Sequence, residues 1–319
     1  MSFPQYPSQY PSQDPYGQPG GAGARDQPGL IPLRPQRVGE MLGVAFAVLR
    51  RHLLPLGGAA IGIALLSSVV LLGLVSANGA LQTYADAQWV NDLLAGGSIP
   101  GAILLASVAS LLVSTIGAPI IAGMAVAYTG AQALGRDGRG AVTERLAGRW
   151  PVLLGVSVAF GVAVSVGLML LVVPGVVAYL IWLLAAPAVV MEKASFGEAF
   201  RRSGQLTRGH RGRIAGAVIV AMLISSVAST VVASMVGALF ASASALTSLI
   251  VTQLVSSVVG GLGAAWTGAV IAVLYIDIRI RTENLDQALR RAAAANPAAA
   301  GGVVPGQGKP QINPPGPVG

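Results

Sequence analysis

The sequence predicts an all-α membrane protein, a polytopic bundle of about six transmembrane helices with amphipathic helices on its cytoplasmic surface. Hydrophobic residues make up 54% of the 319 positions and charged residues only 10%, whereas about 25% of the residues in an average soluble protein are charged. The apolar residues gather in uncharged runs of roughly 20 or more, the length that an α-helix needs to cross a hydrocarbon core. Lys and Arg fall only in alternate connections between these runs. An ordinary soluble domain is therefore excluded.

The composition divides the chain into three parts. Residues 1–35 are rich in Pro, Gln, Tyr and Gly, and residues 292–319 are rich in Ala, Gly and Pro. Both tails are predicted to be disordered cytoplasmic segments, because they have too little apolar surface to bury. The repeated Gln-Tyr-Pro-Ser of the first tail is compatible with two roles. It is either an inert solvated segment or a ligand for a domain with an aromatic groove. Residues 36–291 form the membrane domain, whose first span is expected to be an uncleaved anchor.

The lengths of the apolar runs predict six spans in the membrane domain. They cover residues 53–75, 101–131, 151–173, 175–191, 213–240 and 247–276. Pro174 and Gly175 divide one long run into a tight hairpin, because Pro cannot continue a helical ladder but fits at a helix start. Pro119 lies inside the second span and is expected to kink it.

The positions of the basic residues predict the orientation. They lie before the first span, between the second and third, between the fourth and fifth, and after the sixth. The connections 76–100 and 241–246 contain neither Lys nor Arg. By the positive-inside rule, this alternation predicts a protein of the plasma membrane with both termini in the cytoplasm. It also accounts for the net charge of +8 without nucleic acid as a partner.

The first outer connection is also patterned. Leu81, Tyr84, Trp89 and Leu93 recur at near-helical spacing, so a short helix is predicted to lie on the outer surface.

The segment after the fourth span predicts a basic amphipathic helix at the inner surface. Ser195 and Glu198 have the spacing of a capping box, and Glu198 precedes Arg202 by four residues in the favourable order for an ion pair. The apolar face, predicted to be buried, consists of Phe196, Ala199, Phe200, Ser203 and Leu206. Basic side chains on and after this helix predict a lipid-facing basic patch that binds anionic headgroups. The patch consists of Arg201, Arg202, Arg208, Arg211 and Arg213.

Similar segments precede the first and third spans. A Glu-x-Leu or Glu-x-Phe motif recurs at residues 40–42, 144–146 and 198–200, followed each time by Arg and then by a span. This order is the one expected for three repeats of a surface helix and two spans. The alternative is chance recurrence, because the motif is common.

Three segments carry a resemblance to a known family. In chain order they are GEMLGVAFAVLRRH, PAVVMEKASFGEAFRRSGQLTRG and LYIDIRIRTENLD. They resemble actinobacterial membrane proteins related to the glycerophosphoryl diester phosphodiesterase membrane domain. The resemblance runs from about Leu33 to Leu289 and leaves out both tails. It implies a six-helix membrane module, sometimes fused to a soluble phosphodiesterase barrel, and it implies no catalytic residue.

The residues themselves do not predict an enzyme. A barrel of that kind needs about 250 residues, and no soluble stretch of this chain approaches that length. His52 and His210 each stand near Arg at the predicted surface, where a solvated side chain is favoured over a metal pair. Ser side chains in the spans have no base to activate them. We therefore predict no catalytic residue, no metal site and no cofactor.

Transport is the alternative function. Ion-coupled carriers usually place an ionisable group within the membrane, and no predicted span has one at depth. Hydroxyl and amide side chains of the last two spans, including Gln253, Ser256 and Ser257, either line a path or serve as helix contacts. Spacing by four residues favours contacts. It occurs in Ser225-x-x-x-Ser229, Thr230-x-x-x-Ser234, Gly58-x-x-x-Gly62 and Gly161-x-x-x-Ser165.

The end of the sixth span predicts a boundary ion pair. Asp277 and Arg281 lie on one helix face at i,i+4. Asp277 is also expected to meet an Arg of the amphipathic helices at the membrane boundary, where poor solvation strengthens the attraction. The alternative is an exposed pair that contributes well under about 1 kcal/mol.

Together these patterns favour a non-catalytic multi-pass protein that scaffolds or modulates other membrane or envelope components. The alternative is a permease component for a small solute or a lipid. The expected partners are the bilayer with its anionic headgroups, and either another membrane protein or a second copy of the chain.

Overall fold

A computed structural model describes residues 36–133, 138 and 140–283. Every regular element of these residues is a helix, so the all-α prediction is confirmed. Six helices are long and apolar enough to cross a membrane, which confirms the predicted number of spans and makes the chain a multi-pass membrane protein. Both predicted tails lie outside the described residues.

The six candidate spans begin and end close to the predicted positions. They are Leu53–Ala77, Gly101–Ala133, Trp150–Leu170, Val172–Glu192, Arg211–Leu239 and Ala245–Glu283. In order, they consist of η1 (Leu53–Gly57) with α2 (Gly58–Ala77), α5 (Gly101–Ala133), α7 (Trp150–Leu170), α8 (Val172–Trp182) with α9 (Ala185–Glu192), α11 (Arg211–Leu239) and α12 (Ala245–Glu283). The helix of α5 continues through Pro119.

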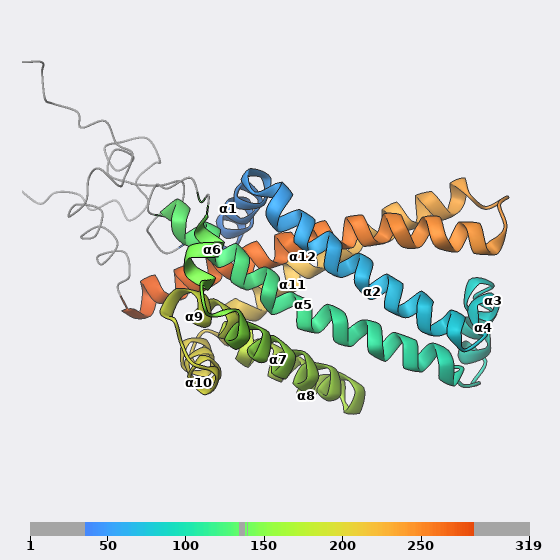
Figure 1. Cartoon of the computed structure of the whole chain (residues 1–319), viewed down its shortest axis with the longest axis horizontal. Coiled ribbons are helices and arrows are strands. Elements are labelled where there is room, and N and C mark those ends of the chain that lie inside the picture. The colour runs from blue at the N-terminus through green and yellow to red at the C-terminus, as the bar shows by residue number, and fades with distance from the viewer. Residues whose placement is uncertain (1–35, 134–137, 139, 284–319) are drawn as a thin grey trace, which may run out of the picture.

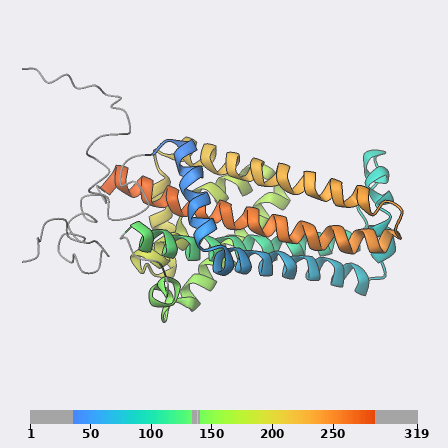
Figure 2. The same cartoon turned by 90° about the horizontal axis from the view of Figure 1, so that it is seen from above.

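The shorter helices divide between the two ends of the bundle. The helices α1 (Val38–Arg51), α6 (Ala141–Leu146) and α10 (Phe196–Thr207) lie at one end, which we call the basic end (Figure 1). All Lys and Arg of the described residues lie at or beside this end. Figure 2 shows α1 running across the long axis of the bundle. At the opposite end, α3 (Leu81–Ala85) and α4 (Gln88–Leu94) take the place of the single short helix that was predicted.

The order of the elements follows the pattern expected for three repeats. Each of α1, α6 and α10 precedes two spans in the chain. Capping boxes that use Glu40 and Glu198 begin α1 and α10. The middle helix differs, because α6 begins after Gly140 in the left-handed conformation, at φ 75°.

The core lies at the basic end and is centred on α12. Nearly every residue of α12 from Ala265 to Ile278 is buried, where the helix packs on α1, α2, α5 and α11. In α5 the burial is similarly concentrated in the second half, from Ile121 to Ala133. The docked short helices are thus part of the same core as the spans.

The fourth span differs from the prediction in two ways. The hairpin turns at Leu171, whose backbone is extended at φ −155° and ψ 133°, and Pro174 lies in the first turn of α8, where its missing N–H removes no helical bond. The span is also broken at Leu183 and Leu184 into α8 and α9. Pro187 stands in the first turn of α9 and marks this second break.

The predicted small-residue contacts are confirmed at some sites and wrong at others. A Cβ added at Gly161 would lie 2.9 Å from Ile116 N, and Ser165 Oγ is 2.9 Å from Thr115 Oγ1, so this pair joins α5 and α7. By contrast, a Cβ at Gly58 or Gly62 would meet nothing within 4 Å. These two glycines therefore lie on a face of α2 that no other helix approaches.

The two small-residue motifs of α11, Ser225-x-x-x-Ser229 and Thr230-x-x-x-Ser234, also differ in whether they contact another helix. Ser225 Oγ is 3.4 Å from the carbonyl oxygen of Gly263 on α12, which is a helix contact. Thr230 and Ser234 are exposed, because this part of α11 faces away from the bundle, and the predicted contact there is wrong.

Candidate functional site at the basic end

The helix α10 presents a buried face to the bundle and a basic face outward. Its capping box includes the Ser195 N–H, which donates to Glu198 Oε2 at 3.4 Å. The fully buried side chains of the helix are Ala199, Ser203, Leu206 and Thr207. Phe200 is half-buried, and its ring is 5.4 Å from that of Trp182. Phe196 was predicted to be buried but is 48% exposed. It is the first residue of the helix, and its ring is 5.5 Å from that of Phe200 in an edge-to-face arrangement.

Ser203 joins α10 to the break in the fourth span through two hydrogen bonds. Its Oγ donates to the carbonyl oxygen of Ile181 at 2.6 Å and accepts from the N–H of Leu184 at 3.1 Å. These two backbone groups flank the break and lose helical partners there. One hydroxyl group on a surface helix therefore completes the hydrogen bonding of a broken span.

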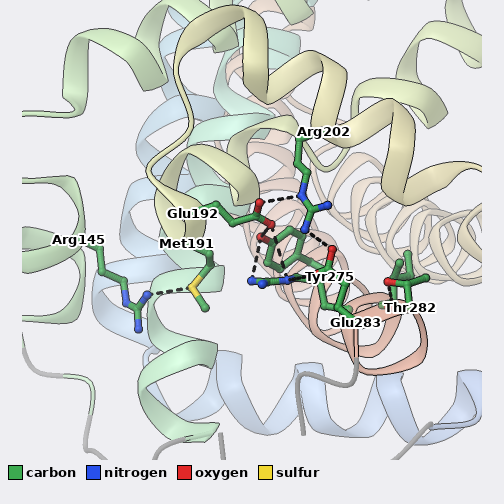
Figure 3. Close-up of polar contacts among 9 residues, drawn as sticks. Arg145, Met191, Glu192, Arg202, Tyr275, Thr282 and Glu283 are labelled. Carbon is green, nitrogen blue, oxygen red and sulfur yellow. Dashed lines mark hydrogen bonds and ion pairs between the residues drawn. The ribbon is translucent and has the colours of Figure 1, made fainter. Parts of the chain in front are cut away.

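A group of charged side chains joins α9, α10 and α12 (Figure 3). This Glu192 cluster consists of Glu192, Arg202, Tyr275, Arg279 and Glu283. Arg202 Nε donates to Glu192 Oε2 at 2.7 Å, and a second nitrogen of Arg202 donates to Glu283. Tyr275 donates its hydroxyl to Glu192 Oε1 at 2.5 Å, and Arg279 Nε donates to Glu283 Oε2 at 2.8 Å. The negative charges of two carboxylates and the positive charges of two guanidiniums are thus equal in number within the cluster.

The contacts of Arg202 in the Glu192 cluster contradict the prediction that this side chain faces lipid. Burial lowers the pKa of this guanidinium, but hydrogen bonds and attraction from Glu192 and Glu283 outweigh it, and the pKa is raised above its usual value. Arg202 therefore forms ion pairs with Glu192 and Glu283 instead of facing lipid. The predicted pair with Glu198 is also wrong, because that carboxylate is engaged in the capping box.

A second group, the Asp277 cluster, joins the approach to α1 with α11 and α12. It consists of Asp277, Arg213, Arg281 and Gln36. Asp277 Oδ2 accepts from Arg281 Nε at 2.9 Å and from Arg213 Nε at 3.1 Å. Its Oδ1 accepts the Gln36 N–H at 2.8 Å, and the Gln36 carbonyl oxygen accepts from both guanidiniums. The Asp277 side chain is 0% exposed.

The expected pair of Asp277 and Arg281 is thus present, and Arg213 adds to it. Since the carboxylate is fully buried, the alternative of an exposed pair does not hold. Arg213 was expected in the lipid-facing patch. It turns inward because a buried carboxylate without a cationic partner is strongly unfavourable.

Three members of the predicted patch remain on the outer surface. Arg201, Arg208 and Arg211 are exposed. None of them has an acidic partner among residues 36–133, 138 and 140–283. Together they form what we call the outer basic patch, with Arg201 on α10, Arg208 directly after this helix and Arg211 at the start of α11.

The two His residues lie in different surroundings. His52 was expected at the surface but is buried, because the residue that ends α1 turns toward α5. There its Nε2 is 2.8 Å from Gln132 Nε2, and its ring stacks on Tyr128 at 4.2 Å. His210 is the residue before α11. The described part of the chain contains no group of three or more His, Cys, Asp or Glu that could hold a metal ion.

A cavity of about 340 Å³ lies between α2, α5 and α12, within the candidate spans. Its polar lining residues are Ser67, Ser68, Ser114, Gln253, Ser256 and Ser257. Ser68 Oγ is 2.7 Å from Ser257 Oγ and accepts from Gln253 Nε2 at 2.9 Å. The polar residues of the sixth span therefore both line a cavity and contact another helix.

Sequence reasoning missed the part that α2 and α5 contribute to this cavity. The available signal was the Ser67-Ser68 pair, together with the spacing of Ser110 and Ser114, within two otherwise apolar spans. In the structure Ser67 Oγ is 2.7 Å from Ser110 Oγ and 2.9 Å from Ser114 Oγ.

Comparison with protein families gives a match over the second to sixth spans. A family model described as Domain of unknown function (DUF7847) matches residues 107–278, which is more than half of the chain. The match extends from within α5 to the Asp277 cluster in α12 and leaves out α1, α2, α3 and α4. No curated protein and no solved structure matches the chain.

Proposed function

The chain belongs to the family of this domain of unknown function (DUF7847), a membership that names no activity, and we propose that it is a non-catalytic protein that scaffolds or modulates other membrane components. In this proposal the basic end faces the cytoplasm of the plasma membrane and binds anionic lipid headgroups. We propose as well that the chain is related to the glycerophosphoryl diester phosphodiesterase membrane domain, and that it acts beside a separate enzyme or transporter.

The observation that carries the proposal is the division of the basic side chains into two sets. Arg202 is paired with Glu192 of α9 and with Glu283 of α12, and Arg213 is paired with the buried Asp277 of α12. These two cations therefore join α10 and α11 to α12. Arg201, Arg208 and Arg211 point outward on the same elements. A cation that stabilised only the fold would have a protein partner, whereas an exposed row at a membrane boundary suits anionic phosphates, at about 1 kcal/mol for each side chain.

The test is purification from native membranes of the wild-type chain and of a variant with Arg201→Gln, Arg208→Gln and Arg211→Gln. The variant should remain monodisperse, because none of these side chains contacts the core. Compared with the wild type, it should co-purify with much less anionic lipid. Proteins that co-purify with the wild type should be absent from the variant. An unchanged lipid and protein composition would contradict the proposed role of the outer basic patch.

The non-catalytic part of the proposal has its own test. Purified protein should not hydrolyse glycerophosphodiesters, with or without a divalent metal ion. Sustained metal-dependent turnover that follows the protein through every purification step would overturn it.

A permease role is a second candidate, favoured by the cavity between α2, α5 and α12. Polar side chains within a membrane are often functional, and Ser256 lines the cavity without a hydrogen bond to the described residues. The lining carries hydroxyl and amide groups but no charge, which suits a small uncharged polyol. Glycerol-driven swelling of proteoliposomes tests this candidate. It should be fast in the wild type and slow with Ser256→Phe, and a wild-type rate equal to that of empty liposomes would remove it.

A further inference from the structure

A groove lies on the surface of the bundle between α1, η1, α11 and α12. It has a volume of about 430 Å³, and its lining is apolar except for Arg50 and Ser225. Leu53, Ile224 and Leu262 are among the apolar residues. From the geometry and charge of this groove we infer that it binds one anionic phospholipid, with an acyl chain in the groove and the phosphate at Arg50.

The close approach of α11 and α12 forms the floor of the groove. A Cβ added at Gly263 would lie 2.8 Å from Ser225 Cβ, so only a residue without a side chain permits this contact. Trp266 forms a wall, and its Nε1 donates to the Leu42 carbonyl oxygen of α1 at 3.4 Å. The helix α1 runs across the bundle (Figure 2), and its residues Phe46, Leu49 and Arg50 line the groove.

Size argues for an acyl chain rather than a helix from another protein. A helix is at least about 10 Å across with its side chains and rises 5.4 Å per turn. A cylinder of that width would fill about 430 Å³ in roughly one turn. One turn gives little contact for a stable helix pair, whereas a flexible acyl chain is narrow enough to follow the groove.

Charge argues that the lipid is anionic. Arg50 is exposed and has no acidic partner in the described part of the chain. A guanidinium binds phosphate through two parallel hydrogen bonds. Arg51 is exposed next to it at the end of α1, so the local charge favours a headgroup with net negative charge over a zwitterionic one, whose cation would be repelled.

This inference does not depend on the proposed scaffolding role. Arg50 lies on α1, outside the outer basic patch on α10 and α11. The groove can bind lipid whether or not the patch recruits partners, and the two proposals can fail separately.

The position of Trp266 permits a direct test in the full-length chain. A parent variant keeps Trp266 and replaces the other tryptophans by Trp89→Phe, Trp150→Phe and Trp182→Phe. It is reconstituted in phosphatidylcholine vesicles that contain a minor fraction of either phosphatidylglycerol or phosphatidylcholine brominated on the acyl chains. Brominated phosphatidylglycerol should quench Trp266 fluorescence with about fivefold higher apparent affinity, the factor expected for one basic side chain near an anionic lipid.

Two pairs of variants separate the phosphate contact from the groove. Arg50→Gln should remove the preference for phosphatidylglycerol, whereas Arg51→Gln, with the same change of charge one residue away, should keep most of it. Ala228→Phe should reduce quenching by both lipids because Ala228 lines the groove. Val227→Phe is the matched control, since Val227 is 55% exposed and lies outside the lining.

Two results would overturn the inference. The first is equal quenching of the parent by both brominated lipids. The second is quenching that is weak at high protein content and rises on dilution into lipid, because that behaviour would mean that a second copy of the chain occupies the groove.

Discussion

The two ends of the bundle are held together in different ways. At the basic end, α12 is buried from Ala265 to Ile278, and the Glu192 and Asp277 clusters join it to the neighbouring helices. At the opposite end, no residue of α11 after Ala221 and none of α12 before Ser257 is buried. A cavity of about 380 Å³ there is lined by α2, by Leu81 of α3 and by the start of α12. Figure 1 shows the hairpin of α11 and α12 diverging from the other spans toward that end.

This difference indicates which part of the molecule determines how the helices are arranged. Apolar side chains give little preference for one helix arrangement inside a membrane, because lipid is as apolar as they are. Buried charges have few acceptable positions, since each needs its partners. The basic end is therefore expected to be rigid, and the α11–α12 hairpin should be free to adjust at the opposite end.

The largest expected effect is the loss of the Asp277 carboxylate. Asp277→Ala leaves Arg213, Arg281 and the Gln36 N–H without their buried acceptor, which costs about 3–5 kcal/mol. The exposed Asp86 of the opposite end serves as the control, and Asp86→Ala should cost less than about 1 kcal/mol. The comparison requires reversible unfolding by SDS in mixed micelles. Similar losses for both variants would show that the clusters do not hold the basic end.

A smaller effect is expected at the break in the fourth span. Ser203→Ala leaves the Ile181 carbonyl and the Leu184 N–H unpaired in the core, at a cost of about 1–3 kcal/mol. Ser234→Ala is the matched control, since Ser234 is exposed on α11 and should change the unfolding free energy by little. Hydrogen exchange at Leu184 should rise in the first variant only. Unchanged exchange there would mean that α10 does not complete the broken span.

The smallest effect is expected for the hydroxyl contacts within the spans. Ser68→Ala removes the contacts with Ser257 and Gln253, and a hydrogen bond between membrane helices averages about 0.6 kcal/mol. Reversible unfolding by SDS measures the loss of unfolding free energy in this variant and in Asp277→Ala, so the two losses can be compared directly. A loss for Ser68→Ala that equals the loss for Asp277→Ala would remove the distinction between the ends.

The sequence was sufficient for the elements that depend on local properties. The number of spans follows from the lengths of apolar runs, and α10 follows from its capping box and helical periodicity. The pair of Asp277 and Arg281 was predicted because the two residues lie four positions apart on one helix face.

The direction of each side chain was not predictable from local sequence. Arg201 and Arg202 are neighbours, yet one is exposed and the other meets Glu283, which is 81 positions away. The break at Leu183 was missed for the same reason, since its unpaired backbone groups are satisfied by Ser203 from another helix. Such features depend on packing between distant segments.

We propose that the two ends of the bundle lie on opposite sides of the membrane, with the basic end in the cytoplasm. The chain has no Cys, so a single introduced Cys reports one position without background. Ser98→Cys and Ser242→Cys mark the opposite end, and Gln205→Cys marks α10, where the side chain is exposed. An impermeant maleimide added to intact cells should label the first two variants and should label Gln205→Cys only after permeabilisation. Labelling of Gln205→Cys in intact cells, with protection of Ser98→Cys and Ser242→Cys, would contradict the claim.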